Sequence, residues 1–149
     1  MPSIAILGAG AMGSGLANAL VRAGWEVNLW GTWLDDHLID AIEAGKPHPR
    51  IDVVISDKVS TFRSGDLNMA MAGVDVVVMS VASVGVPKVA ELAFEGISKA
   101  KALWLTTKGF LPAEDGTIEL LPVGLRRMAQ NAGVTLPPIV AIAGPVKAN

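Results

Sequence analysis

Short apolar runs alternate with segments whose apolar residues recur at helical spacing along most of the chain. The runs contain four to six residues and are rich in Val, Ile and Leu, which is typical of strands buried on both faces of a parallel sheet. We expect strands at residues 3–7, 26–30, 51–55, 75–80, 102–107 and 139–142.

Helices are expected between these runs, at residues 11–23, 35–44, 67–72, 87–94 and 118–131. Gly24 and Gly45 stand where the first two helices would end, because glycine readily adopts the left-handed conformation of a C-terminal cap. Pro87 fits the first turn of its helix, where an amide proton is not needed. The alternation predicts βαβ units and one doubly wound α/β domain with a parallel sheet over residues 1–149.

Composition narrows the classes of protein that fit. The chain has 149 residues, 51% of them hydrophobic, which suffices for one domain with a core. Its net charge is 12 − 14 = −2 without a basic run, so a nucleic-acid partner is not expected. No apolar stretch reaches membrane-spanning length, and the start lacks a signal peptide's basic flank, which predicts a cytoplasmic protein.

No metal site is expected from the residue types present. The chain contains no cysteine, and its only imidazoles are His37 and His48, with no carboxylate cluster around them. We expect His37 on an exposed helix face. His48 lies between two prolines and is expected to be structural.

Residues 8–13, Gly-Ala-Gly-Ala-Met-Gly, satisfy the G-x-G-x-x-G pattern and follow a predicted strand at the start of a predicted helix. This context favours a dinucleotide-binding turn of the Rossmann type. Gly8 would permit the tight turn, Gly10 would let the backbone approach a pyrophosphate, and Gly13 would let the helix pack on the strand. The alternative is that the glycines only allow close packing.

The residue that would bind the adenosine ribose is expected about 20 residues beyond this turn, at residues 31–32. Neither an acid that would favour NAD nor an arginine that would favour NADP stands there. Asp35 and Asp36 come three residues later and could equally cap the next helix. Arg50 and Lys46 could fold back toward the same pocket, so the sequence leaves NAD or NADP open.

Several motifs together resemble the NAD(P)-dependent glycerol-3-phosphate dehydrogenase family. They are GAGAMGSGLA, VNLWGT, GKPHPR, DVVVMSVAS, TTKGF and AGPVKAN, in this order over residues 4–149. The pair Lys108-Gly109 after a strand, followed by Gly144-Pro145-x-x-Ala148, is the most specific part. The resemblance implies hydride transfer between NAD(P) and a small substrate, glycerol 3-phosphate or dihydroxyacetone phosphate.

The resemblance also implies roles for individual residues. The amides of Ala11 and Met12 would meet the pyrophosphate, Thr32 would contact adenosine, and residues 80–83 would run beneath the nicotinamide ribose. Lys108 would contact cofactor and substrate and is the expected catalytic residue. The expected cofactor-binding residues are Gly8, Gly10, Ala11, Met12, Gly13, Thr32, Arg50, Ser80, Val81, Ala82, Ser83, Lys108, Gly144 and Ala148.

The chain departs from the family pattern in three places. Ala82 stands where the family often has proline, and the chain stops at Asn149, before the glutamate of its last motif. The family's helical substrate domain, with a catalytic lysine and a phosphate-binding arginine, is absent from this chain. We therefore expect residues 1–149 to bind the cofactor and do little chemistry, while homodimer formation by a full-length protein stays open.

Other interpretations remain at this point. A lysine after a buried strand lies where open α/β sheets bind ligands, which supports Lys108 without the family, but it could also be a solvated loop residue. Trp30 and Trp33 are expected to cover the core and the pocket edge, with contact to adenine as an alternative. The chain could instead belong to a ketopantoate or hydroxyacid reductase, or be a free-standing, non-catalytic nucleotide-binding domain.

Overall fold

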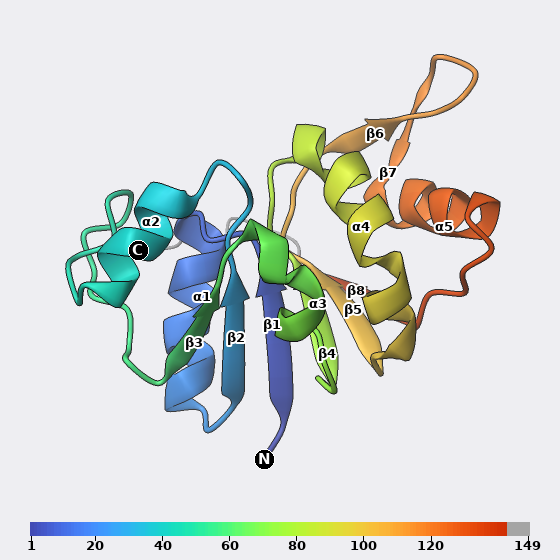
Figure 1. The fold of residues 1–149 in the computed structure, drawn as a ribbon. Helices are drawn as coiled ribbons and strands as arrows, with labels where there is room; N and C mark the ends of the chain where they lie inside the picture. Colours follow the sequence, from blue (N-terminus) through green and yellow to red (C-terminus); the bar gives the residue numbers. More distant parts are fainter. Residues whose placement is uncertain (143–149) are drawn as a thin grey trace.

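The sheet at the centre of the molecule has six parallel strands (Figure 1). In this computed structural model, which describes residues 1–142, the strand order is β3-β2-β1-β4-β5-β8. The strands are β1 (Ser3–Leu7), β2 (Glu26–Trp30), β3 (Val59–Phe62), β4 (Val76–Met79), β5 (Ala102–Leu105) and β8 (Ile139–Ala141). The doubly wound α/β fold expected from the sequence is thereby confirmed.

Within residues 1–142, five helices and two short 3₁₀ turns connect the strands. They are α1 (Ala11–Arg22), α2 (Asp36–Glu43), η1 (Ser64–Asp66), α3 (Leu67–Ala70), η2 (Ser83–Gly85), α4 (Val86–Lys99) and α5 (Leu121–Asn131). The strand order reverses between β1 and β4, because the chain first adds β2 and β3 on one side and then crosses to the other. This switch point is where open α/β sheets form a crevice at the carboxyl ends of their strands.

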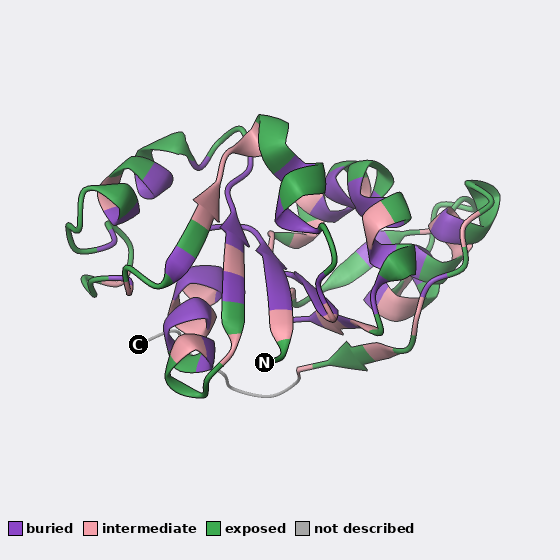
Figure 2. Ribbon diagram, turned by 60° about the horizontal axis from the view of Figure 1, so that its bottom comes forward, coloured by how far each residue is buried: buried purple, intermediate pink, exposed green. Residues whose placement is uncertain are grey.

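Alternate residues of β1 face two separate cores. Ile4 and Ile6 pack in a cluster with residues of α1 and α2, whereas Ala5 and Leu7 pack in a cluster with residues of α3, α4 and α5. All four are completely buried, and Figure 2 shows β1 buried along most of its length. Burial on both faces explains why the strands read as continuous apolar runs.

The prediction of a third strand at residues 51–55 is wrong, because β3 begins at Val59. The apolar residues of this segment belong to a folded loop, in which Pro47 and Val54 form an isolated antiparallel bridge. Asp52 has a φ of 52°, which extended strands do not adopt. β3 itself reads Val-Ser-Thr-Phe and lies at the sheet edge, where polar residues are tolerated.

The predicted helix at 118–131 begins too early. Residues Ile118–Leu120 form β7, which pairs antiparallel with β6 (Phe110–Pro112) as a hairpin that the sequence analysis did not expect. α5 starts only at Leu121, with Pro122 in its first turn.

Pro87 lies in the first turn of α4 as predicted, but this helix runs on to Lys99 rather than ending near residue 94.

Within residues 1–142, no helix is both long and apolar enough to cross a membrane.

Candidate functional site

A cleft of about 260 Å³ lies at the switch point, at the carboxyl ends of β1, β2 and β4. Its walls come from the glycine-rich turn, the turn after β2, the segment after β4 and the start of α4. The lining residues are Gly8, Gly10, Thr32, Trp33, Leu34, Asp35, Arg50, Ser80, Val81, Ala82, Val84, Gly85 and Val89.

Two of the three motif glycines are required by the fold. Gly8 has a φ of 119°, and a Cβ there would lie 2.5 Å from the carbonyl oxygen of Ser80. A Cβ at Gly13 would overlap the carbonyl oxygen of Gly8, so glycine there lets α1 begin directly beside the turn. The turn at Gly8 is as expected from the sequence, and a Cβ at Gly13 would also lie 3.3 Å from Ile6 Cγ2 of β1, in keeping with the expected packing of the helix on the strand.

Gly10 differs, because the described part of the fold does not require glycine there. Its φ of −67° and ψ of −173° suit any residue. Among the described residues, a Cβ at this position would meet only the Arg50 Nη1 atom, at an ordinary 3.5 Å. Gly10 nevertheless lines the cleft, and a side chain there would enter it.

Side chains from other elements hold the peptide groups of Ala9, between the first two motif glycines. The Ala9 amide donates to Asp35 Oδ2 at 3.3 Å. The Ala9 carbonyl accepts from Ser14 Oγ at 3.0 Å and lies 2.9 Å from His48 Nε2. These bonds fix the turn directly before α1, and the amino end of a helix, whose first amides have no partner within the helix, is suited to anion binding.

Asp35 does not cap the next helix with its side chain, which was one of the roles expected from the sequence. It occupies the N-cap position of α2 but makes no side-chain cap hydrogen bond. Its Oδ2 atom instead accepts from the Thr32 amide at 3.0 Å and the Thr32 hydroxyl at 3.1 Å, besides the Ala9 amide. This buried carboxylate ties the turn after β2 to the glycine-rich turn.

Of the two basic residues expected near the cleft, only Arg50 reaches it. Arg50 is among the lining residues, and its Nη1 atom lies beside Gly10. Lys46 is exposed and does not line the cleft. The positive charge beside Gly10 is therefore the guanidinium of Arg50, which can bind phosphate through two parallel hydrogen bonds.

The two neighbouring tryptophans have separate roles. Trp30 is completely buried in a core cluster, and its indole Nε1 donates to the Ser64 carbonyl at 3.4 Å. Trp33 is 40% exposed and lines the cleft. The Lys88 Nζ atom lies 4.3 Å from the centroid of the Trp33 ring, a cation–π contact that joins the turn after β2 to the first turn of α4.

The segment after β4 is fixed by the threonines that follow β5. The Ser80 hydroxyl accepts a hydrogen bond from the Thr106 hydroxyl at 2.8 Å, and the Thr107 hydroxyl donates to the Val81 carbonyl at 2.6 Å. The Ser80 amide also donates to the Leu7 carbonyl at 2.9 Å. These contacts hold residues 80–82 along one wall of the cleft.

Lys108 follows these threonines and is exposed. Its neighbour Gly109 has a φ of 116°, and a Cβ there would lie 3.3 Å from Ser83 Oγ. The Lys108-Gly109 pair is therefore next to the segment after β4, although Lys108 and Ser83 do not line the cleft itself.

The structure brings seven of the predicted site residues together as cleft-lining residues: Gly8, Gly10, Thr32, Arg50, Ser80, Val81 and Ala82. Ala11, Met12 and Gly13 form the start of α1 behind the turn, while Gly144 and Ala148 lie outside the described residues. Four further residues line the cleft only because of the fold, and no motif predicts them: Leu34, Val84, Gly85 and Val89. In residues 1–142, no group of three or more His, Cys, Asp or Glu could hold a metal.

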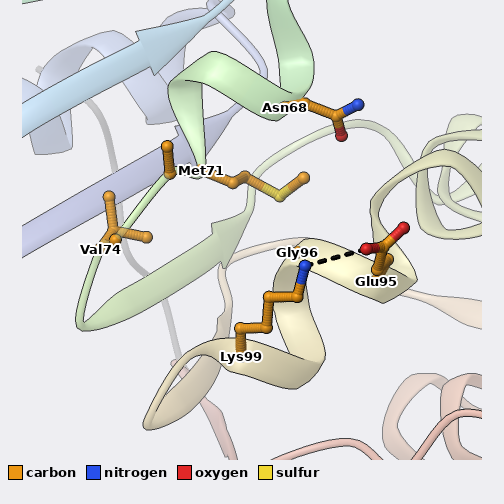
Figure 3. Close-up of a pocket in the computed structure, with 8 residues that line it drawn as sticks. Asn68, Met71, Val74, Glu95, Gly96 and Lys99 are labelled. Carbon is orange, nitrogen blue, oxygen red and sulfur yellow. Dashed lines mark hydrogen bonds and ion pairs between the residues drawn. The ribbon is translucent and has the colours of Figure 1, made fainter.

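A second pocket, of about 440 Å³, lies between α3 and α4, next to the turn that precedes β4 (Figure 3). It is larger than the cleft, and two of its lining residues, Glu95 and Lys99, form an exposed ion pair at 2.8 Å. Met71 fills its wall against Gly96, where a Cβ would overlap the methionine side chain. It is at the amino end of β4, away from the glycine-rich turn, so we assign the candidate site to the smaller cleft.

The parallel sheet, its strand order and the glycine-rich turn at the switch point define a Rossmann-type domain. Comparison with known proteins then identifies the family. Residues 3–149 match the family described as NAD-dependent glycerol-3-phosphate dehydrogenase N-terminus, and the chain belongs to this family.

Individual relatives agree with this assignment. An NADP(+)-dependent glycerol-3-phosphate dehydrogenase from Archaeoglobus fulgidus is 33% identical over 142 residues, covering 95% of this chain and 41% of the relative. A glycerol-3-phosphate dehydrogenase [NAD(P)+] from Oceanobacillus iheyensis is 27% identical over 149 residues, covering 97% of this chain and 40% of the relative. The crystal structure of glycerol-3-phosphate dehydrogenase from Coxiella burnetii has a TM-score of 0.77 at 26% identity and covers 99% of this chain and 42% of that one. The chain thus spans about two fifths of these relatives.

Proposed function

We propose that this chain binds NAD or NADP in the cleft at the glycine-rich turn and is the cofactor-binding part of a glycerol-3-phosphate dehydrogenase. The observation that carries the proposal is Gly10: the described fold does not need glycine there, yet the residue lines the cleft beside the start of α1. A glycine whose missing side chain leaves cleft space open is suited to close approach of a pyrophosphate.

The chemistry would be hydride transfer between NAD(P) and glycerol 3-phosphate or dihydroxyacetone phosphate, as the names of the relatives suggest. Hydride transfer is the cofactor's own chemistry, and the protein supplies binding, orientation and charge. Lys108, carried on the loop after β5, would attract the anionic substrate and donate to the oxygen that gains negative charge during ketone reduction. The other substrate-binding groups would come from a further domain, so residues 1–149 alone would turn over little substrate.

Arg50 would donate hydrogen bonds to the 2′-phosphate of NADP. Its guanidinium lies beside Gly10 and lines the cleft that also contains Thr32, the expected adenosine contact. A charge-assisted, bidentate contact would favour NADP(H) without excluding NAD(H). The relative from Archaeoglobus fulgidus, which is named as NADP(+)-dependent, is in keeping with this assignment.

The test of the proposal is calorimetric titration of the wild-type chain and Gly10→Ala with NADH and NADPH. We expect the substitution to abolish or strongly weaken binding of both nucleotides. Its effect on the melting temperature should be small, since alanine fits the backbone conformation of residue 10. Unchanged binding by Gly10→Ala would show that the nucleotide does not approach this turn.

A further inference from the structure

His48 is completely buried, and each of its ring nitrogens contacts a backbone group of a different segment. Nε2 lies 2.9 Å from the carbonyl oxygen of Ala9 in the glycine-rich turn. Nδ1 accepts a hydrogen bond from the Arg50 amide at 3.2 Å. Because a carbonyl oxygen can only accept, Nε2 carries the proton and donates, and Nδ1 is the acceptor.

The backbone of His48 also closes the loop that carries Arg50. Its amide donates to the Val53 carbonyl at 2.8 Å, and its carbonyl accepts from the Asp52 amide at 2.9 Å. The far end of the loop is attached to α1 by Asn18, whose Nδ2 donates to the Val54 carbonyl at 3.0 Å. The imidazole of His48 and the amide of Asn18 therefore fasten the same loop to α1 and to the turn before it.

The two contacts of the imidazole have different consequences. The Ala9 carbonyl is also bonded by Ser14, at 3.0 Å, so the glycine-rich turn keeps one support without His48. The contact to the Arg50 amide fixes the backbone from which the guanidinium extends to Gly10. The side chain of Arg50 itself is exposed, and its position depends on this backbone.

We propose that His48 is a positioning residue that gives the cleft its preference for NADP(H) over NAD(H), by holding Arg50 beside Gly10. The proposal rests on the proposed function, because it requires that the dinucleotide binds at this turn. His48 does not line the cleft, so it would not contact the bound dinucleotide directly. It acts on the phosphate-binding residue through the backbone.

The test compares the dissociation constants of NADPH and NADH, measured by calorimetry, for the wild-type chain, His48→Ala, His48→Asn and His48→Gln. An asparagine side-chain oxygen can accept from the amide two residues on, which replaces the Nδ1 contact. A glutamine amide can donate to the Ala9 carbonyl, which replaces the Nε2 contact. His37→Ala, on the exposed face of α2, is the matched control.

We expect the wild-type chain and His37→Ala to prefer NADPH. His48→Ala and His48→Gln should weaken NADPH binding about tenfold, the size of one charge-assisted contact, with little change for NADH. His48→Asn should keep most of the preference, even where its melting temperature falls. In an Arg50→Ala background, substitution of His48 should produce no further selective loss, because the two residues act through one contact.

If His48 were merely structural, its replacement would weaken binding of NADPH and NADH equally. His48→Asn and His48→Gln would then have the same effect. Equal losses for NADPH and NADH, or a wild-type chain without a preference, would overturn the role of His48 while leaving dinucleotide binding intact. A wild-type chain that binds neither nucleotide would instead overturn the proposed function. If His48→Ala does not fold, the comparison of His48→Asn with His48→Gln decides the question.

Discussion

The Asp35 Oδ2 atom accepts hydrogen bonds from the amides of Ala9, at 3.3 Å, and Thr32, at 3.0 Å. One carboxylate oxygen thus joins the loops that follow β1 and β2, although they are far apart in sequence. Both loops line the cleft. The geometry of the site therefore depends on a buried carboxylate that itself lines the cleft.

Replacing Asp35 should destabilise the domain. Asp35→Ala leaves two buried amide donors without their acceptor, and each such loss costs about 1–3 kcal/mol. We expect the free energy of unfolding in urea to fall by about 2 kcal/mol or more, with a smaller loss for Asp35→Asn, which keeps one acceptor oxygen. Asp36→Ala is the control: this neighbouring carboxylate is 61% exposed and 3.7 Å from Arg63, so it should cost less than about 1 kcal/mol. Equal effects of the two alanine variants would contradict the role of Asp35.

Trp33 should report nucleotide binding by fluorescence. It is the tryptophan that lines the cleft, whereas Trp30 is buried. Trp25 and Trp104 make a tilted ring contact, with centroids 5.8 Å apart, against the core cluster that contains Ile4 and Ile6. We expect Trp33→Phe to remove most of the NADH-dependent change in emission while calorimetry still detects binding. A change that persists in Trp33→Phe would mean that the nucleotide binds near another tryptophan.

Stability in acid should depend on Asp75. Hydrogen bonds from Lys101 and from the amide and hydroxyl of Ser3 lower the pKa of the Asp75 carboxyl group from 3.8 to about 2. A carboxyl group with a lowered folded pKa stabilises the fold above its unfolded pKa, and this contribution is lost as pH falls from 3.8 through about 2.

We therefore expect Asp75→Asn to lower the melting temperature at neutral pH. The difference from the wild-type chain should shrink as the pH falls through this window, as a series of melting curves would reveal. Glu95→Gln, which breaks an exposed ion pair with Lys99, should have a smaller effect at neutral pH. A constant difference between the wild-type chain and Asp75→Asn down to pH 2 would show that ionisation of Asp75 is not the cause.

Lys108 should matter for turnover and little for stability. Lys108 is exposed, and exposed polar interactions contribute little, so Lys108→Ala should lower the free energy of unfolding by less than about 1 kcal/mol. In a protein that carries this domain together with a substrate domain, Lys108→Ala should lower kcat about a hundredfold, as loss of one donor to a developing oxyanion does. Lys108→Arg should not restore it, because a planar guanidinium does not replace a compact ammonium. Normal turnover by Lys108→Ala, or failure of this variant to fold, would contradict the proposed role of Lys108.

The first βαβ unit could be predicted almost residue by residue from the sequence. Strands 3–7 and 26–30 have the predicted bounds. β1 is an apolar run that is buried on both faces from Ile4 to Leu7, whereas the apolar residues of β2 alternate with the exposed Glu26 and the partly buried Asn28. The edge strand β3 was missed because Ser60 and Thr61 interrupt it, while the more apolar segment 51–55 belongs to a loop. Apolar content indicates burial and does not by itself distinguish a strand from a packed loop.

The glycine motif located the cleft, but the polar contacts that shape it could not be predicted. Asp35 was considered as a helix cap and His48 as a structural residue, and neither could be paired with Ala9 from the sequence. These contacts connect residues 26 and 39 positions apart, and they form only after the intervening loops fold onto α1. The only sequence signal was the presence of polar residues in segments flanked by apolar or proline residues.

The most direct measurement is calorimetric titration of the purified wild-type chain with NADH, NADPH and ADP-ribose. The pyrophosphate site is local to the first βαβ unit, so we predict saturable binding of all three ligands with one site per chain. ADP-ribose should bind because it keeps the adenosine and pyrophosphate groups that this unit would hold. Absence of any binding heat and of any rise in melting temperature at millimolar ligand would contradict the claim that this chain is a dinucleotide-binding domain.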